Sequence, residues 1–132
     1  MVLAEYYKRG IFKWINPVRR RRQQMPQMVI QVLTTRSRSL RDTITRDQKL
    51  QDYKLKVVQH KKSTRSLGWS KLRSTEGAHG ALNMRWEGNF RMLLCRVVTK
   101  AGGTPGFIIS DFVYYLLTRY KRKIQAISII PR

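Results

Sequence analysis

The segment from residue 90 to residue 99, FRMLLCRVVT, constrains the fold most strongly, because its apolar residues follow one another with little alternation. They are Met92, Leu93, Leu94, Cys95, Val97 and Val98. A strand carries such a run when both faces of its sheet are covered. The segment therefore predicts a central strand that is packed on both sides.

The residues before this segment predict a hairpin. Between Leu82 and Trp86, apolar and polar residues alternate, as they do in a strand with one buried face. Glu87-Gly88-Asn89 then offers a tight connection, since glycine accepts the positive φ that such turns need. A further short strand is predicted over residues 69–74.

The residues after the segment predict a helix and a last strand. The connection 101–106, AGGTPG, is rich in turn formers. We expect Thr104 to cap the helix and Pro105 to take its first position, where the missing N–H costs nothing. The helix is predicted over residues 105–121, and a β-branched strand over residues 124–130.

These patterns together predict an α+β fold. We expect a small antiparallel or mixed sheet with a C-terminal helix packed on it and a last strand after that helix. A basic N-terminal extension precedes them. The predicted division is a basic arm with a short amphipathic helix over residues 1–26, a basic helix and strand extension over residues 27–66, and an α+β core over residues 67–132.

The extension contains weaker signals. Residues 2–15 have the spacing of an amphipathic helix, and residues 27–34 read as a strand. Ser39 and Asp42 form a capping-box pattern at the start of a predicted helix over residues 40–52. This helix is mostly polar, so we expect it to lie on an external surface such as a nucleic-acid groove or a neighbouring protein. Residues 53–59 alternate as a half-buried strand with a basic outer face.

Positive charge dominates the composition. The chain has 28 Lys and Arg residues against 7 Asp and Glu residues, a formal net charge of +21. A small domain with this charge repels itself unless a polyanion neutralises it, and each neutralised phosphate adds affinity by releasing a counterion. Nucleic acid is the expected partner, and an anionic membrane surface is a less favoured one.

Basic clusters and nearby aromatic residues mark the candidate binding residues. Four arginines stand in a row, the loop after residue 59 begins HKK, and the predicted helix ends in RYKRK. We expect Lys and Arg to contact phosphates, while exposed aromatic rings stack on unpaired bases. The predicted nucleic-acid-binding residues are Arg19, Arg20, Arg21, Arg22, Arg36, Arg38, Lys61, Lys62, Arg65, Trp69, Lys121, Arg122 and Lys123.

Each aromatic ring could either pack in the core or stack on a base. Trp86, Phe107 and Phe112 lie inside predicted strands or the predicted helix, so we expect them to pack in the core. For Trp14 and Trp69, which lie close to basic clusters, both roles stay open.

Catalysis is not expected. Cys95, the single cysteine, lies in an apolar run, where a thiol behaves as a small buried hydrophobe. His60 and His79 have no partner suited to acid–base work, and the sequence offers no Cys/His cluster for a metal. AGGTPG lacks the Gly-Lys-Ser/Thr ending of a phosphate-binding loop. We therefore predict no enzyme activity, no metal, no cofactor and no small-molecule substrate.

The leading hypothesis is a structural protein of a ribonucleoprotein. A basic arm on a small α+β core is similar in general style to ribosomal proteins, so rRNA and neighbouring proteins of a large assembly are the expected partners. Residues 1–22 are amphipathic and rich in arginine, like organellar transit peptides, although they lack serine. The predicted location is a mitochondrial or other organellar matrix, and otherwise the cytoplasm.

Two alternatives remain open. One is a stand-alone single-stranded DNA- or RNA-binding regulator that uses the sheet face and its aromatic residues as a stacking platform. The other is a peripheral subunit of a membrane complex that uses residues 2–15 as an interfacial helix.

Overall fold

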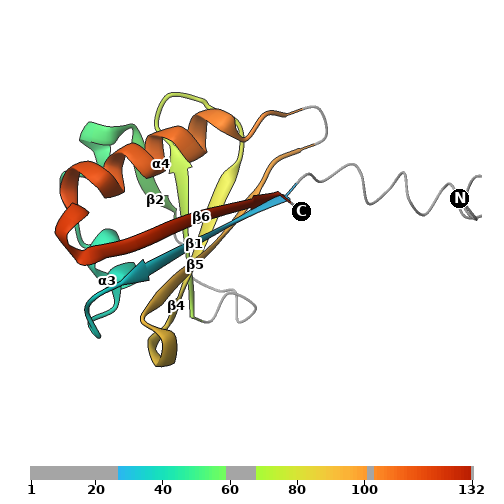
Figure 1. Ribbon diagram of the computed structural model, residues 1–132. Helices are drawn as coiled ribbons and strands as arrows, with labels where there is room; N and C mark the ends of the chain where they lie inside the picture. The colour runs from blue at the N-terminus through green and yellow to red at the C-terminus, as the bar shows by residue number, and fades with distance from the viewer. Residues whose placement is uncertain (1–26, 59–67, 101–102, 132) are drawn as a thin grey trace, which may run out of the picture.

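The computed structural model describes residues 27–58, 68–100 and 103–131, which form a mixed α+β fold (Figure 1). Six strands make one antiparallel sheet in the order β2-β3-β4-β5-β1-β6. The strands are β1 Gln27–Thr34, β2 Leu55–Val58, β3 Trp69–Ser74, β4 Ala81–Glu87, β5 Met92–Val98 and β6 Ile124–Pro131. Two α-helices accompany them, α3 Leu40–Thr45 and α4 Gly106–Arg119.

Strand β1 joins the two halves of the sequence. It lies between β5 and β6, with Ile30 opposite Cys95 on one side and opposite Ile129 on the other. The sheet therefore contains strands from both sides of the predicted boundary at residues 66 and 67. The predicted arm and its helix over residues 2–15 lie outside the described residues.

The core lies between one face of the sheet and α4, which runs across that face (Figure 1). Ile108, Phe112 and Leu116 of α4 are fully buried in the same cluster as alternate residues of the strands. Burying each such side chain contributes about 1.5–3 kcal/mol, so this layer supplies most of the stabilisation. The strand residues of this cluster are Ile30, Val32, Leu55, Leu72, Leu82, Met84, Leu93, Cys95 and Val97.

The prediction that the strand at residues 92–98 is packed on both sides is wrong. Leu93, Cys95 and Val97 are fully buried, but Arg96 is exposed and Leu94 is half-buried. The strand alternates because α4 covers only one face of the sheet, so the residues between the core positions face outward.

Helix α4 begins later than predicted. Pro105, not Thr104, is the N-cap residue, and it makes no side-chain capping bond. Phe112 packs in the core as expected, and Trp86 is half-buried against it. Phe107 was expected in the core but is 70% exposed, because Ile108 and Phe112 define the inward face and Phe107 lies off it.

Helix α3 starts as predicted and ends early. The Ser39 side chain accepts a hydrogen bond from the Asp42 amide at 3.2 Å, which confirms the cap. The helix stops at Thr45, and Leu50–Tyr53 form a separate 3-10 turn, η2. Leu40 and Ile44 are buried in the protein's own core. The helix therefore packs on the protein itself and does not need the external surface that we expected.

The carboxylate of Asp47 links the segment after α3 to the end of α4. It accepts hydrogen bonds from the hydroxyls of Tyr115 and Tyr120 at 2.8 and 2.6 Å, and from the Arg119 guanidinium at 2.9 and 3.1 Å. Burial alone would raise the pKa of Asp47, but the bonds from Arg119, Tyr120, the Lys49 amide and Tyr115 together hold it well below its ordinary 3.8. The carboxylate therefore stabilises the fold in its charged form.

Replacing Asp47 by Asn should lower the free energy of unfolding at neutral pH by about 2–4 kcal/mol, because an amide brings its own N–H groups to a site filled with donors. The folded-state pKa of Asp47 is depressed, so its contribution is complete above about pH 4 and is lost as the pH falls through the folded value. Urea unfolding at several pH values measures both effects.

The matched control for this variant is Asp52→Asn, which changes an exposed carboxylate in the adjacent turn. We expect a change within about 0.5 kcal/mol. Equal losses in the two variants would show that Asp47 acts only through net charge.

Candidate nucleic-acid interface

Three turns meet at one end of the sheet. They are the β1–α3 loop over residues 35–39, the turn between β4 and β5, and the 3-10 turn η5 (Lys121–Lys123) between α4 and β6. The amide of Thr34 donates to the carbonyl of Arg91 at 2.9 Å, and the amide of Thr35 donates to the carbonyl of Lys123 at 3.0 Å. These backbone bonds hold the turns together, and we call this part of the molecule the basic end.

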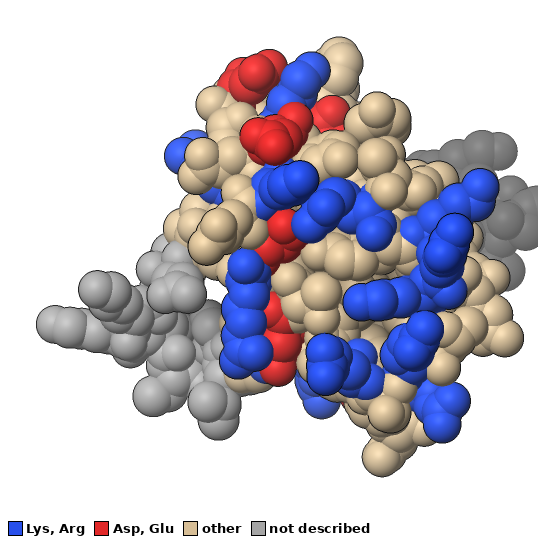
Figure 2. All heavy atoms as spheres, turned by 90° about the vertical axis from the view of Figure 1, so that its left-hand side faces the viewer, with Lys and Arg blue, Asp and Glu red and all other residues tan. Residues whose placement is uncertain are grey.

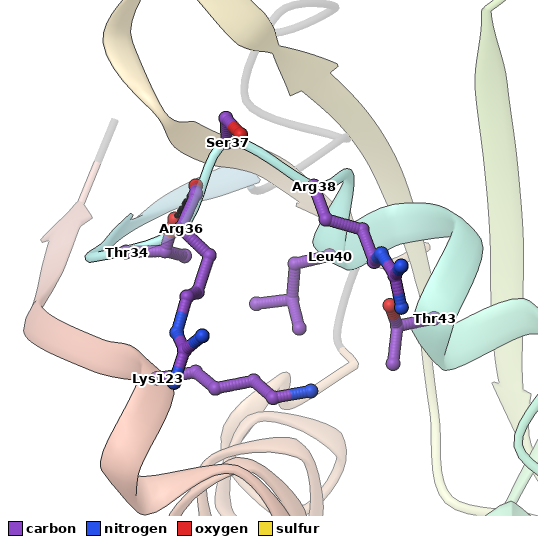
Figure 3. A pocket seen from close by; sticks show the side chains of 7 residues that line it. All are labelled: Thr34, Arg36, Ser37, Arg38, Leu40, Thr43 and Lys123. Carbon is purple, nitrogen blue, oxygen red and sulfur yellow. Dashed lines mark hydrogen bonds between the residues drawn. The ribbon is translucent and has the colours of Figure 1, made fainter.

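A pocket of about 320 Å³ opens between the β1–α3 loop and η5 (Figure 3). Arg36 extends down one side of it, Lys123 runs across its bottom, and Arg38 comes down the opposite side beside Thr43. Leu40 lies between them and links the pocket to the core, because it is also a buried residue of α3. The lining residues are Thr34, Arg36, Ser37, Arg38, Leu40, Thr43 and Lys123.

The cations of this pocket have no acidic partner in the part of the chain that the structure describes. The ion pairs there use other cations, namely Arg41, Lys54, Arg85 and Arg119. Of the seven acidic side chains in the sequence, only Glu5 falls outside the described residues. Figure 2 views this end and shows Lys and Arg side chains spread over its lower right, with the acidic side chains elsewhere.

The structure brings some of the predicted binding residues together. Arg36, Arg38 and Lys123 share the pocket, and Lys121 and Arg122 are exposed in the adjoining turn. Predicted residues outside the described part of the chain are Arg19, Arg20, Arg21, Arg22, Lys61, Lys62 and Arg65.

Trp69 lies apart from the basic end pocket, at the start of β3. Its ring is half-buried, with the guanidinium carbons of Arg85 and Arg96 at 5.8 and 5.3 Å from the ring centroid. Sequence reasoning did not select these two arginines. Their alternation with buried Met84 and Cys95 marks them as outward-facing, but their contact with Trp69 depends on strand register.

The chemistry of the basic end pocket suits a phosphate group. A guanidinium donates two parallel N–H groups to phosphate oxygens, while an ammonium acts as a compact point charge. The pocket has both kinds of group around one opening: guanidinium groups from Arg36 and Arg38 and an ammonium group from Lys123. Ser37 adds a hydroxyl. The pocket therefore offers donors and positive charge suited to holding an anion.

The thiol of Cys95 is placed for packing. It is fully buried in the core, and burial raises its pKa above the ordinary value. A thiol that stays protonated is a poor nucleophile. Residues 27–58, 68–100 and 103–131 also hold no group of three or more His, Cys, Asp or Glu side chains able to bind a metal. Within the same ranges, no helix is long and apolar enough to cross a membrane.

Alkylation of Cys95 by iodoacetamide should be at least about a hundredfold slower in the native protein than in guanidinium-denatured chain, since the thiol reacts only after the core opens. Mass spectrometry of timed samples measures the rate. Equal rates in the two states would place the thiol at the surface.

Comparison of the chain with models of known protein families, with curated protein sequences and with solved structures finds no match.

Proposed function

We propose that this chain is a non-enzymatic nucleic-acid-binding protein that contacts RNA phosphates through its basic end. The observation that carries the proposal is the pocket at which Arg36, Arg38 and Lys123 converge without a carboxylate. Confined cations of one sign repel each other, and a phosphodiester backbone relieves that repulsion. The net charge of +21 extends the same attraction over the whole molecule.

The mechanism is electrostatic capture followed by positioning. The charge speeds diffusional encounter, and the guanidinium groups of Arg36 and Arg38 then fix the phosphate at the pocket. Lys121 and Arg122, exposed beside the pocket, contact the neighbouring phosphates of the same backbone. Such contacts set the position of the protein on RNA without reading its bases.

The biological setting that fits this mechanism best is a ribonucleoprotein. We propose a structural role in a ribosome, with rRNA and adjacent ribosomal proteins as partners, in a mitochondrial or other organellar matrix. The support is the combination of a small α+β sheet with an excess of unpaired cations, which a large RNA neutralises.

The test uses the double variant Arg36→Gln/Arg38→Gln and fluorescence anisotropy with a labelled RNA hairpin. At about 0.1 M salt we expect affinity to fall about tenfold or more, because two phosphate contacts are lost. The plot of log affinity against log salt concentration should also become less steep by about 1.4–1.8.

The control is Lys49→Gln/Lys54→Gln, which removes the same charge from exposed positions around η2. We expect its affinity to stay within about threefold of the unaltered chain. Equal losses in both double variants would assign binding to net charge and not to the pocket. A chain that binds no RNA at low salt would overturn the proposed function.

A further inference from the structure

The face of the sheet turned away from α4 is basic over strands β2 to β5, and we call this surface the open face. Strand register places Lys56 opposite Arg73, Lys71 opposite Asn83, and Asn83 opposite Arg96. Each of these side chains alternates along its strand with a core residue. The cations of the open face are Lys56, Lys71, Arg73, Arg85 and Arg96, and Trp69 and Asn83 lie among them.

The cations of the open face are largely without acidic partners. Glu87 pairs with Arg85 at 2.7 Å, but no ion pair of the described residues includes Lys56, Lys71, Arg73 or Arg96. Lys56 and Arg73 stand directly opposite each other, and like charges in that position destabilise a sheet. An anion that lies across the strands would remove this cost.

Trp69 gives one end of the open face a fixed geometry. Its ring lies near the guanidinium groups of both Arg85 and Arg96, so the two side chains are held over the sheet instead of extending freely into water. A guanidinium held in this way loses less freedom when it binds a phosphate.

A cavity of about 710 Å³ lies at the other end of the open face, where the β3–β4 and β5–α4 connections meet. Lys71, Arg73 and Lys100 line it together with His79, Asn83 and Thr99. No carboxylate is among its lining residues. The volume lies within the range of small-ligand sites, about 300–1,000 Å³, and is more than twice that of the basic end pocket.

One buried polar group beside this cavity lacks a partner among the described residues. The Thr99 hydroxyl belongs to a residue that is 2% exposed, and it makes no hydrogen bond in the described structure. A Cβ added to Gly80, whose φ is +107°, would lie 2.8 Å from the Thr99 methyl carbon. The backbone therefore closes tightly around Thr99, and its hydroxyl is shut off from the cavity because Thr99 follows the buried positions Cys95 and Val97 along the strand.

We propose that the open face binds a single-stranded segment of nucleic acid and that the cavity takes one of its nucleotides. The inference rests on the proposed function and adds the strandedness of the ligand and the surface that binds it. Lys71, Arg73 and Lys100 hold the phosphate of this nucleotide, and the Asn83 amide faces its base as donor and acceptor. A paired base inside a duplex cannot enter the cavity, so the site selects unpaired segments.

The test compares a uridine octamer with an RNA duplex as labelled probes, on the full chain and on Lys71→Gln/Arg73→Gln. We expect the variant to lose about tenfold or more in affinity for the octamer and less than about threefold for the duplex. The charge-conserving control Lys71→Arg/Arg73→Lys should bind the octamer within about threefold of the unaltered chain. An octamer affinity that Lys71→Gln/Arg73→Gln leaves unchanged overturns the proposal.

These experiments separate this inference from the proposed function. A chain that binds the hairpin through Arg36 and Arg38, but binds the octamer equally well with and without Lys71 and Arg73, would overturn the open-face site alone. A chain that binds neither probe would overturn both.

Discussion

Among the described residues, helices cover the sheet on one face only, and this decides which way the charged residues of the strands face. A covered face must be apolar, so Ile30, Leu93 and Phe112 face inward and the lysines and arginines of the strands face the other way. The turns at one end of the sheet carry further cations, namely Arg36, Arg38 and the three of η5. The one-sided covering thus accounts for the open face, while the cations of the basic end lie in turns outside the strands.

Four of the six acidic side chains in the described residues form ion pairs within the fold. Asp47 is almost fully surrounded by donors from Tyr115, Arg119 and Tyr120, and Glu87 pairs with Arg85. These contacts leave most cations of the two basic surfaces without a carboxylate. Charge that the fold does not neutralise is available to a ligand, and a polyanion is the ligand that neutralises it most completely.

Local signals were sufficient for some elements and not for others. The strands over residues 27–34 and 69–74 and the Ser39 cap were predicted correctly, because β-branched runs and capping residues act over short distances. The role of Asp47 could not be predicted, since its partners lie 68 to 73 positions along the chain. Arg36, Arg38 and Lys123 were each predicted to contact phosphate, but their shared pocket depends on the pairing of β1 with β6.

The most direct test of the central claim is to identify what co-purifies with the full chain at low salt. We predict an RNA component with a high ratio of absorbance at 260 nm to that at 280 nm, which about 1 M salt or ribonuclease removes. Sequencing of that RNA then shows whether rRNA is enriched. A chain that elutes at low salt as a folded protein free of nucleic acid, and does not acquire RNA when RNA is added, would contradict the account.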